Sequence, residues 1–282
     1  MLVTLIIVGA LLGGLVIGNL TDDDGDDASE ESGRDLTGTE GDDMLGGGPN
    51  GDLLDALGGD DEVMGFLGDD TIDGGSGDDR LLGGEGQDQI DGGAGDDTVF
   101  AGAGDDAAVG RAGADSIRGG DGADILDGGA GDDTVAGDDG DDLLSGGAGM
   151  DTVRGGAGDD ILNGIDVDLE TDQPTEQVRD RLVGEDGDDL LILGARDQGF
   201  GGDGADVFSI SSEIGVGEAV SIEDFDPAED RLDVILAAGE PQPEVATADN
   251  GGSTDVFLDG VRVASVRGVT GLDPSTITFS RF

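Results

Sequence analysis

Residues 38–163 decide the fold, because they repeat a nine-residue pattern fourteen times without a change of register. The units read GTEGDDMLG, GGPNGDLLD, ALGGDDEVM, GFLGDDTID, GGSGDDRLL, GGEGQDQID, GGAGDDTVF, AGAGDDAAV, GRAGADSIR, GGDGADILD, GGAGDDTVA, GDDGDDLLS, GGAGMDTVR and GGAGDDILN. The sixth position is always Asp, the eighth is always apolar, and the fourth is Gly except at Asn50, the non-glycine residue type that best tolerates a positive φ. A strict period of this kind predicts a solenoid.

The pattern matches the nonapeptide G-G-x-G-x-D-x-U-x, so this stretch resembles the RTX, or haemolysin-type, calcium-binding repeat family. Two degenerate units follow at residues 184–192 and 201–209, and residues 201–234 resemble the closing segment that follows such arrays. The resemblance covers about two thirds of the chain and implies an all-β fold. That fold is a right-handed parallel β-roll with two units per turn.

The residue types explain the period. We expect each unit to form a six-residue loop, in which glycines allow positive φ, and a three-residue strand that turns its eighth residue inward. The predicted core is therefore a ladder of Leu45, Leu54, Val63, Ile72, Leu81, Ile90, Val99, Ala108, Ile117, Leu126, Val135, Leu144, Val153 and Leu162.

The loops have the chemistry of calcium sites, because calcium prefers six to eight oxygen ligands and a Gly-rich loop ending in Asp offers carbonyls and a carboxylate. In the arrangement that the resemblance implies, an ion lies between loops eighteen residues apart. The candidate ligands are Asp43, Asp52, Asp61, Asp70, Asp79, Asp88, Asp97, Asp106, Asp115, Asp124, Asp133, Asp142, Asp151 and Asp160, with Asp189 and Asp206 beyond the array. Six gaps along each edge predict roughly 12 Ca²⁺ ions.

The fifth-position acids are a separate case, because Gln87, Ala114, Ala123 and Met150 occupy the same place in other units. They are interpreted mainly as outward, solvating charge. They are Asp42, Asp60, Asp69, Asp78, Asp96, Asp105, Asp132, Asp141 and Asp159.

The composition excludes several classes of function. The 282 residues include 59 Gly, 68 Asp or Glu and 12 basic residues, all Arg, for a net charge of −56, and they lack His, Lys and Cys. A Ser-His-Asp triad, a His-based zinc site and a catalytic thiol are thus impossible. Nucleic acid is a poor partner for such a charge, whereas cations are natural ones. The thin core cannot offset the entropy of ordering the array, so we expect calcium binding to drive folding.

The N-terminal segment is different in character. Residues 2–20 (LVTLIIVGALLGGLVIGNL) are uncharged and, as a helix, would be about 28 Å long, close to the thickness of a bilayer core. We expect an N-terminal hydrophobic helix that acts as a membrane anchor, with a cleaved signal or a buried helix as alternatives. Residues 21–37 (TDDDGDDASEESGRDLT) are expected to form an acidic disordered linker.

The remaining segments flank or follow the array. Residues 164–183 are expected to form an insertion loop, and residues 184–236 contain the degenerate repeats and closing segment. Residues 237–282 are predicted to be a C-terminal β cap, with strands at residues 244–248, 254–259 and 261–266 and a turn at Asp259-Gly260. The apolar end ITFSRF fits either a capping strand or the type I secretion signal that RTX proteins carry.

The leading functional prediction is a non-enzymatic calcium-binding module, exported or anchored at a bacterial cell surface. The alternatives are a surface adhesin or matrix scaffold with an unknown partner, and the remnant of an RTX secreted enzyme, for which residues 1–37 leave no catalytic domain. Ice binding would need regular outward rows of Thr. At such positions of the array only Thr71, Thr98, Thr134 and Thr152 occur, and they are scattered in the sequence.

Overall fold

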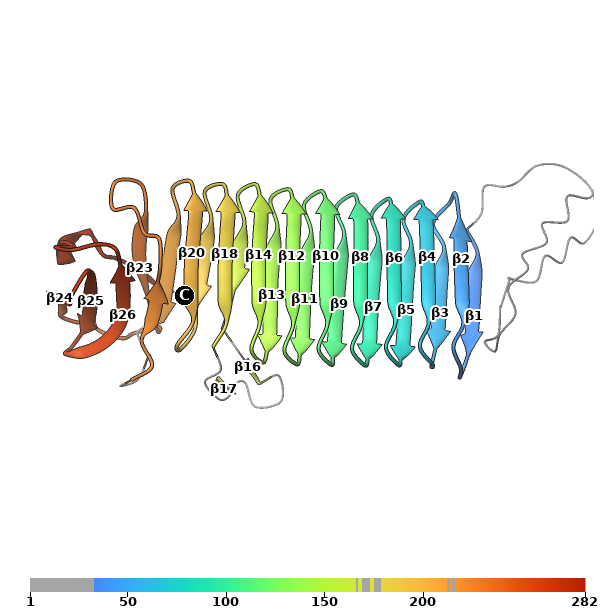
Figure 1. Cartoon of the computed structure of the whole chain (residues 1–282), viewed down its shortest axis with the longest axis horizontal. Coiled ribbons are helices and arrows are strands. Elements are labelled where there is room, and N and C mark those ends of the chain that lie inside the picture. Colours follow the sequence, from blue (N-terminus) through green and yellow to red (C-terminus); the bar gives the residue numbers. More distant parts are fainter. Residues whose placement is uncertain are drawn as a thin grey trace, which may run out of the picture.

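Two long parallel sheets face each other in the computed structural model, which describes residues 33–165, 167–168, 173–174, 179–211, 214 and 217–281 (Figure 1). In residues 35–163, successive strands alternate between the two sheets, and each strand pairs with the next strand but one. For example, Ile72 pairs with Ile90, eighteen residues later. The chain is therefore an all-β solenoid in which two nonapeptides complete a turn, as predicted; its right hand stays a prediction.

The first sheet has twelve strands among the described residues. In spatial order they are β1 (Asp35–Thr39), β3 (Leu53–Leu57), β5 (Thr71–Ser76), β7 (Gln89–Ala94), β9 (Ala107–Ala112), β11 (Ile125–Ala130), β13 (Leu143–Ala148), β15 (Ile161–Asn163), β19 (Leu190–Leu193), β21 (Val207–Ser211), β23 (Arg231–Leu236) and β27 (Thr278–Arg281).

The second sheet has thirteen strands in the same described ranges. They are β2 (Met44–Gly48), β4 (Glu62–Leu67), β6 (Arg80–Glu85), β8 (Thr98–Ala103), β10 (Ser116–Asp121), β12 (Thr134–Asp139), β14 (Thr152–Ala157), β18 (Arg181–Asp186), β20 (Gln198–Asp203), β22 (Val220–Ile222), β26 (Val261–Arg267), β25 (Ser253–Leu258) and β24 (Val245–Asp249). A separate antiparallel pair joins β16 (Val167–Asp168) to β17 (Gln173–Pro174).

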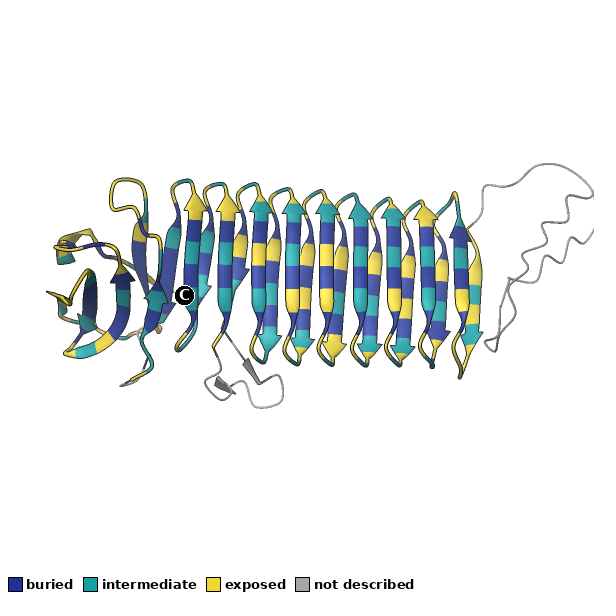
Figure 2. Ribbon diagram, in the orientation of Figure 1, coloured by how far each residue is buried: buried dark blue, intermediate teal, exposed yellow. Residues whose placement is uncertain are grey.

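The core lies between the two sheets and confirms the predicted ladder. All fourteen eighth-position residues are at most 5% exposed. Burial alternates along each strand, so dark and light bands run across the roll in register (Figure 2). The ladder continues beyond the array through Leu182, Leu191 and Phe208.

The strands are longer than predicted. Most array strands have six residues, from the seventh position of one unit to the third position of the next, as in Thr71–Ser76. The three-residue prediction was wrong because the glycines at the first two positions continue the strand. They pair through their backbones, as Gly75 does with Gly93, without a side chain that would indicate it. The actual turn is positions four to six.

The structure also moves two predicted boundaries. Strand β1 begins at Asp35, inside the segment 21–37 that was predicted to be linker, because Leu36 packs against the core. Strand β18 begins at Arg181, so the roll resumes before the predicted end of the insertion, 164–183. The predicted positive φ at Asn50 is not found.

One surface row differs from the sequence-based interpretation. Thr98, Ser116, Thr134 and Thr152 are direct neighbours on successive strands of the second sheet. Each precedes a buried core residue, so these side chains point outward. Three of the four threonines that are scattered in the sequence therefore form one row with Ser116. The fourth, Thr71, lies on the other sheet.

The C-terminal strands extend both sheets. The three predicted strands correspond to β24, β25 and β26, which pair antiparallel. Asp259 and Gly260 both have positive φ, as a two-residue hairpin turn of type I′ requires. After a short 3₁₀ turn at Pro274–Thr276, β27 adds to β23 at the end of the first sheet. The capping role of residues 237–282 stays a prediction.

The predicted N-terminal helix, residues 2–20, lies outside the described residues, as does most of the predicted linker. In the part of the chain that the structure describes, no helix is long and apolar enough to cross a membrane.

Candidate metal sites along the two edges

The sixth-position aspartates line both edges of the roll, between the strands of the two sheets. All sixteen predicted residues, from Asp43 to Asp206, are at most 5% exposed although each carries a carboxylate. An exposed loop Asp would be solvated, so burial on this scale needs a compensating partner for every carboxylate.

One carboxylate oxygen of every one of these residues except Asp43 has such a partner in the preceding turn. Asp70 Oδ1, for example, accepts a hydrogen bond from the Asp52 backbone N–H at 2.7 Å, and Asp88 Oδ1 accepts one from Asp70 at 2.8 Å. The bond recurs in every turn, at 2.6–3.0 Å among the aspartates, and forms one continuous ladder along each edge.

The other carboxylate oxygen has no hydrogen-bond partner. This holds for Oδ2 of fifteen of the sixteen predicted residues, and for Oδ1 of Asp43, whose Oδ2 accepts from Thr39. A buried anionic oxygen without a donor is strongly unfavourable. Sixteen of them in strict repetition indicate a position that a cation would occupy.

A backbone carbonyl from the next turn lies near the orphaned oxygen of eleven of these residues. A Cβ added to first-position Gly74 would lie 2.6 Å from both Asp79 Oδ2 and the Gly92 carbonyl oxygen. The absence of a side chain at Gly74 therefore leaves room for both oxygens. Both kinds of oxygen lie within 3.0 Å of the added Cβ at Gly38, Gly47, Gly65, Gly74, Gly83, Gly92, Gly110, Gly119, Gly128, Gly137, Gly155 and Gly184.

The donor set is that of a hard cation. Within the described ranges, no three acidic side chains gather as a metal-binding group, and the oxygens near one another at these positions are a carboxylate and a carbonyl. Carboxylate and carbonyl oxygens without His or Cys suit Ca²⁺ rather than a transition metal.

The electrostatics show the cost of these carboxylates without a cation. Burial raises the pKa of Asp79, Asp124, Asp133, Asp151 and Asp160 to about 7, against the lowering effect of the backbone hydrogen bond. It raises the pKa of Asp88, Asp97, Asp189 and Asp206 to about 6. Neighbouring carboxylates raise each value further.

Sequence reasoning missed three members of the ladders. Asp180 accepts from the Asp151 N–H at 2.9 Å and Asp197 accepts from Asp180 at 3.0 Å, which continues one ladder past the insertion. Asp230 ends the other by accepting from Asp206 at 3.0 Å. A signal was present for Asp180, because Leu182 and Gly184 follow it at the distances of the repeat.

The fifth-position acids also form ladders, which the interpretation as solvating charge did not foresee. They are exposed, yet Asp60 Oδ1 accepts from the Asp78 N–H at 3.1 Å and Asp78 Oδ1 accepts from Asp96 at 2.9 Å. Their bonds reach the following turn, whereas the sixth-position bonds reach the preceding one. Each edge therefore has a second, interrupted series of carboxylate hydrogen bonds that runs in the opposite direction.

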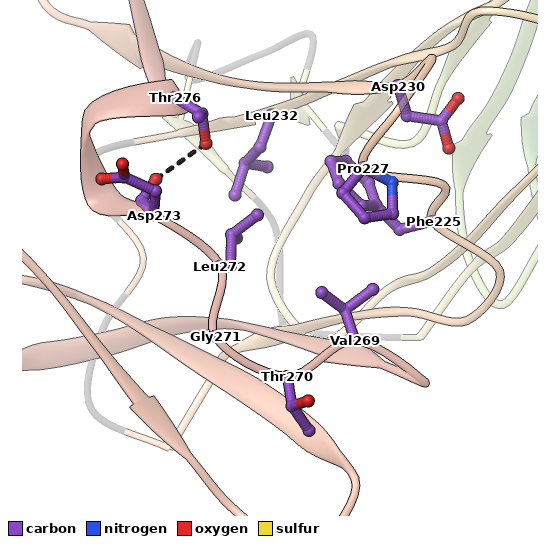
Figure 3. A pocket seen from close by; sticks show the side chains of 10 residues that line it. All are labelled: Phe225, Pro227, Asp230, Leu232, Val269, Thr270, Gly271, Leu272, Asp273 and Thr276. Atoms are coloured by element: carbon purple, nitrogen blue, oxygen red, sulfur yellow. Dashed lines mark hydrogen bonds between the residues drawn. The ribbon is translucent and has the colours of Figure 1, made fainter.

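A pocket of about 240 Å³ lies in the C-terminal part (Figure 3). Its lining residues are Phe225, Pro227, Asp230, Leu232, Val269, Thr270, Gly271, Leu272, Asp273 and Thr276. Asp230 accepts backbone N–H groups from Asp206 and Asp226, and Asp273 accepts one from Ser275. Both carboxylates thus serve the local backbone, and the pocket is not a counterpart of the edge sites.

Comparison with known proteins identifies the repeat. The family model described as RTX calcium-binding nonapeptide repeat (4 copies) matches residues 46–81, 64–99, 73–108, 100–135 and 136–164. No curated protein matches the chain.

Two solved structures show limited similarity. The extracellular lipase LipA from Serratia marcescens is 17% identical, with a TM-score of 0.25 over 59% of this chain and 40% of the lipase chain. The AlgE6R3 subunit of the Azotobacter vinelandii mannuronan C5-epimerase is 23% identical, with a TM-score of 0.20 over 55% of this chain and 77% of that one. The match with the family model identifies residues 46–164 of this chain as RTX calcium-binding nonapeptide repeats.

Proposed function

We propose that the chain is a non-enzymatic module that folds when it binds Ca²⁺, with the sixth-position aspartates as its carboxylate ligands. The observation that carries the proposal is the buried, orphaned oxygen of each of these residues, which in eleven of them lies near a carbonyl of the next turn. The repeats bind calcium as members of their family; the ligand set, the number of ions and the coupling to folding are our proposal.

The number of ions follows from the gaps between loops. Six gaps along each of the two edges of the array give roughly 12 ions, and eleven first-position glycines bring an orphaned aspartate oxygen and a next-turn carbonyl together. These ions would reduce the net charge from −56 to about −32, so the loaded module stays highly acidic.

Coupling to folding follows from the carboxylates. Without cations, sixteen buried oxygens lack donors and neighbouring aspartates repel one another. One apolar residue per unit does not offset that cost together with the entropy of ordering the chain. We therefore expect an expanded chain without calcium and a compact roll with it.

Export to the extracellular side or anchoring at a cell surface is part of the proposal. Extracellular modules bind calcium in the 10⁻⁴–10⁻³ M range, where weak sites are filled, whereas cytosolic calcium would leave them empty. The apolar segment 2–20 would supply an anchor.

The test is a calcium titration of the full chain, followed by far-ultraviolet circular dichroism and small-angle scattering. We expect a cooperative change from coil to β structure at submillimolar to millimolar Ca²⁺, and no such change with Mg²⁺. A chelator that leaves both the spectrum and the radius of gyration unaltered would refute the proposal.

A second candidate function, adhesion or scaffolding, is favoured by the hydroxyl row. Thr98, Ser116, Thr134 and Thr152 present four side chains at strand spacing, about 4.8 Å apart, on a sheet that calcium would make rigid. Retention of cells or polysaccharide by immobilised, calcium-loaded protein, and its loss when the row is replaced by Asp, is the test of this function.

A further inference from the structure

The ladder on one edge begins with an arginine instead of an aspartate. Counting back nine residues from Gly38 gives an incomplete unit, 29–37, in which Leu36 is the eighth residue and Arg34 the sixth. Leu36 pairs with Leu54, eighteen residues later, and packs against the core. Arg34 is therefore in register with the sixth-position aspartates of the array.

The backbone of Arg34 behaves as that of a ladder residue. Its N–H donates to Asp52 Oδ1 at 2.5 Å, the bond that Asp52 itself makes with Asp70 Oδ1 at 2.7 Å. Its carbonyl accepts from the Leu53 N–H at 2.7 Å, as the Asp52 carbonyl does from Thr71. Only the side chain differs from the rest of the ladder.

The guanidinium reaches the carbonyl that would otherwise bind an ion. Arg34 Nη1 donates to the Gly47 carbonyl oxygen at 2.6 Å. Gly47 is the first residue of the unit that pairs with the incomplete one. In later turns the equivalent carbonyl faces an orphaned aspartate oxygen, as Gly92 does for Asp79.

The space around Arg34 also accommodates its guanidinium group. A Cβ at Gly48 would lie 3.3 Å from Arg34 Cζ, so the absence of a side chain at position 48 leaves room for the planar group. A guanidinium has five N–H donors and keeps its charge at any physiological pH. It can satisfy a carbonyl without the six to eight oxygens that calcium requires.

We infer that Arg34 takes the place of a calcium ion at the N-terminal end of this edge. The inference rests on the proposed function, because it assigns the position of an ion to a side chain. A covalently attached cation would hold Arg34 to the Gly47 carbonyl in β2, and so the first turn together, whether or not the ions are bound. It would thus give the array a starting turn that does not depend on calcium.

The first experiment counts bound ions in full-length Arg34→Asp, which completes the repeat motif. We expect one additional Ca²⁺ per chain compared with wild type, measured by equilibrium dialysis and elemental analysis at saturating calcium. Arg154→Asp is the matched control, since Arg154 is exposed at a ninth position and the charge change is the same. No additional ion in Arg34→Asp, or an equal gain in the control, overturns the inference.

The second experiment removes the charge without adding a ligand. In Arg34→Gln we expect hydrogen exchange of the Leu53 amide, which donates to the Arg34 carbonyl, to become faster by about tenfold in calcium, while central turns are unchanged. Exchange equal to that of Arg154→Gln overturns the inference. A wild-type chain that binds no calcium at all would instead refute the proposed function, so the two failures are distinguishable.

Discussion

Replacing Asp124 by Asn should change stability in opposite directions with and without calcium. Asp124 is buried in the middle of the array, and its Oδ1 accepts from the Asp106 N–H at 2.8 Å. Its Oδ2 has no partner, while the Gly137 carbonyl lies on the far side of the space beside Gly119. Asn has the same shape, keeps one acceptor and turns the other oxygen into a donor.

The two magnitudes follow from the two states. With calcium at about 100 times its dissociation constant, each filled site contributes about 2.7 kcal/mol, and Asp124→Asn should lose that amount together with one ion. Without calcium, the amide N–H₂ can donate to the Gly137 carbonyl, and an unpaired buried charge disappears. Relieving such a group should stabilise the calcium-free roll by about 1–3 kcal/mol.

The assay compares wild type, Asp124→Asn and Asp121→Asn, an exposed control three residues away with the same change of charge. Ion counting and thermal unfolding in calcium give the loss of bound ions and of stability in the calcium-loaded state. Unfolding in chelator with a stabilising osmolyte gives the gain of stability in the calcium-free roll. If Asp124→Asn kept the wild-type number of ions, or destabilised the chelated roll, the assignment of Oδ2 as a calcium ligand would be wrong.

Three other perturbations test separate parts of the structure. In chelator the roll should be more stable at acidic pH. The folded pKa of Asp79 and Asp151 is about 7, above the ordinary Asp value of 3.8, so their contribution to stability is full below about pH 4 and is lost as pH rises through 7. Circular dichroism at pH 5 and pH 8 should show more β structure at pH 5, and the reverse order would contradict the prediction. Gly131→Ala should lower the free energy of unfolding in calcium by more than about 1–2 kcal/mol, because its φ is +145° and a Cβ would overlap the Gly113 carbonyl. Gly251→Ala, also at positive φ but with open space around it, is the control in the same thermal melts. Equal losses of stability in the two variants would exclude the overlap as the cause. Asp180→Ala should cost about 1–3 kcal/mol by leaving the Asp151 N–H without its acceptor, whereas a chain that melts like wild type would show that the ladder is not needed across the insertion.

The fold was predictable from the sequence because the apolar residue and the aspartate recur at fixed positions. A period of nine with one inward residue fixes which side chains form the core, and Leu45 to Leu162 are buried as predicted. The strand lengths were not predictable in the same way. Residues such as Gly74 and Gly75 belong to strands through backbone pairing, and the usual association of glycine with loops points the other way.

The residue types and positions of the candidate site were predictable, but the hydrogen bonds that join its aspartates from turn to turn were predictable only in part. Sixteen carboxylates follow from the motif alone. Asp180 was missed because the insertion changes the spacing of paired turns from 18 to 29 residues. Asp197 was missed because it lies 17 residues after Asp180, in a unit without the usual glycines. The role of fifth-position acids such as Asp78 depends on the direction in which a loop N–H points, and residue type does not specify that direction.

The two oxygens of each ladder carboxylate explain why the array should fold as one unit. Asp88 Oδ1 is bonded to the Asp70 N–H in the turn behind, and Asp88 Oδ2 faces the Ala101 carbonyl in the turn ahead. A cation on Oδ2 therefore connects three successive turns through one side chain. In solenoids, stability is carried by contacts between neighbouring turns, so the loss of an ion weakens both sides of its position. Every sixth-position hydrogen bond in the ladder runs in the same direction, so the first turn of the ladder needs a different stabilising group. Arg34 supplies it, with a cation that cannot dissociate.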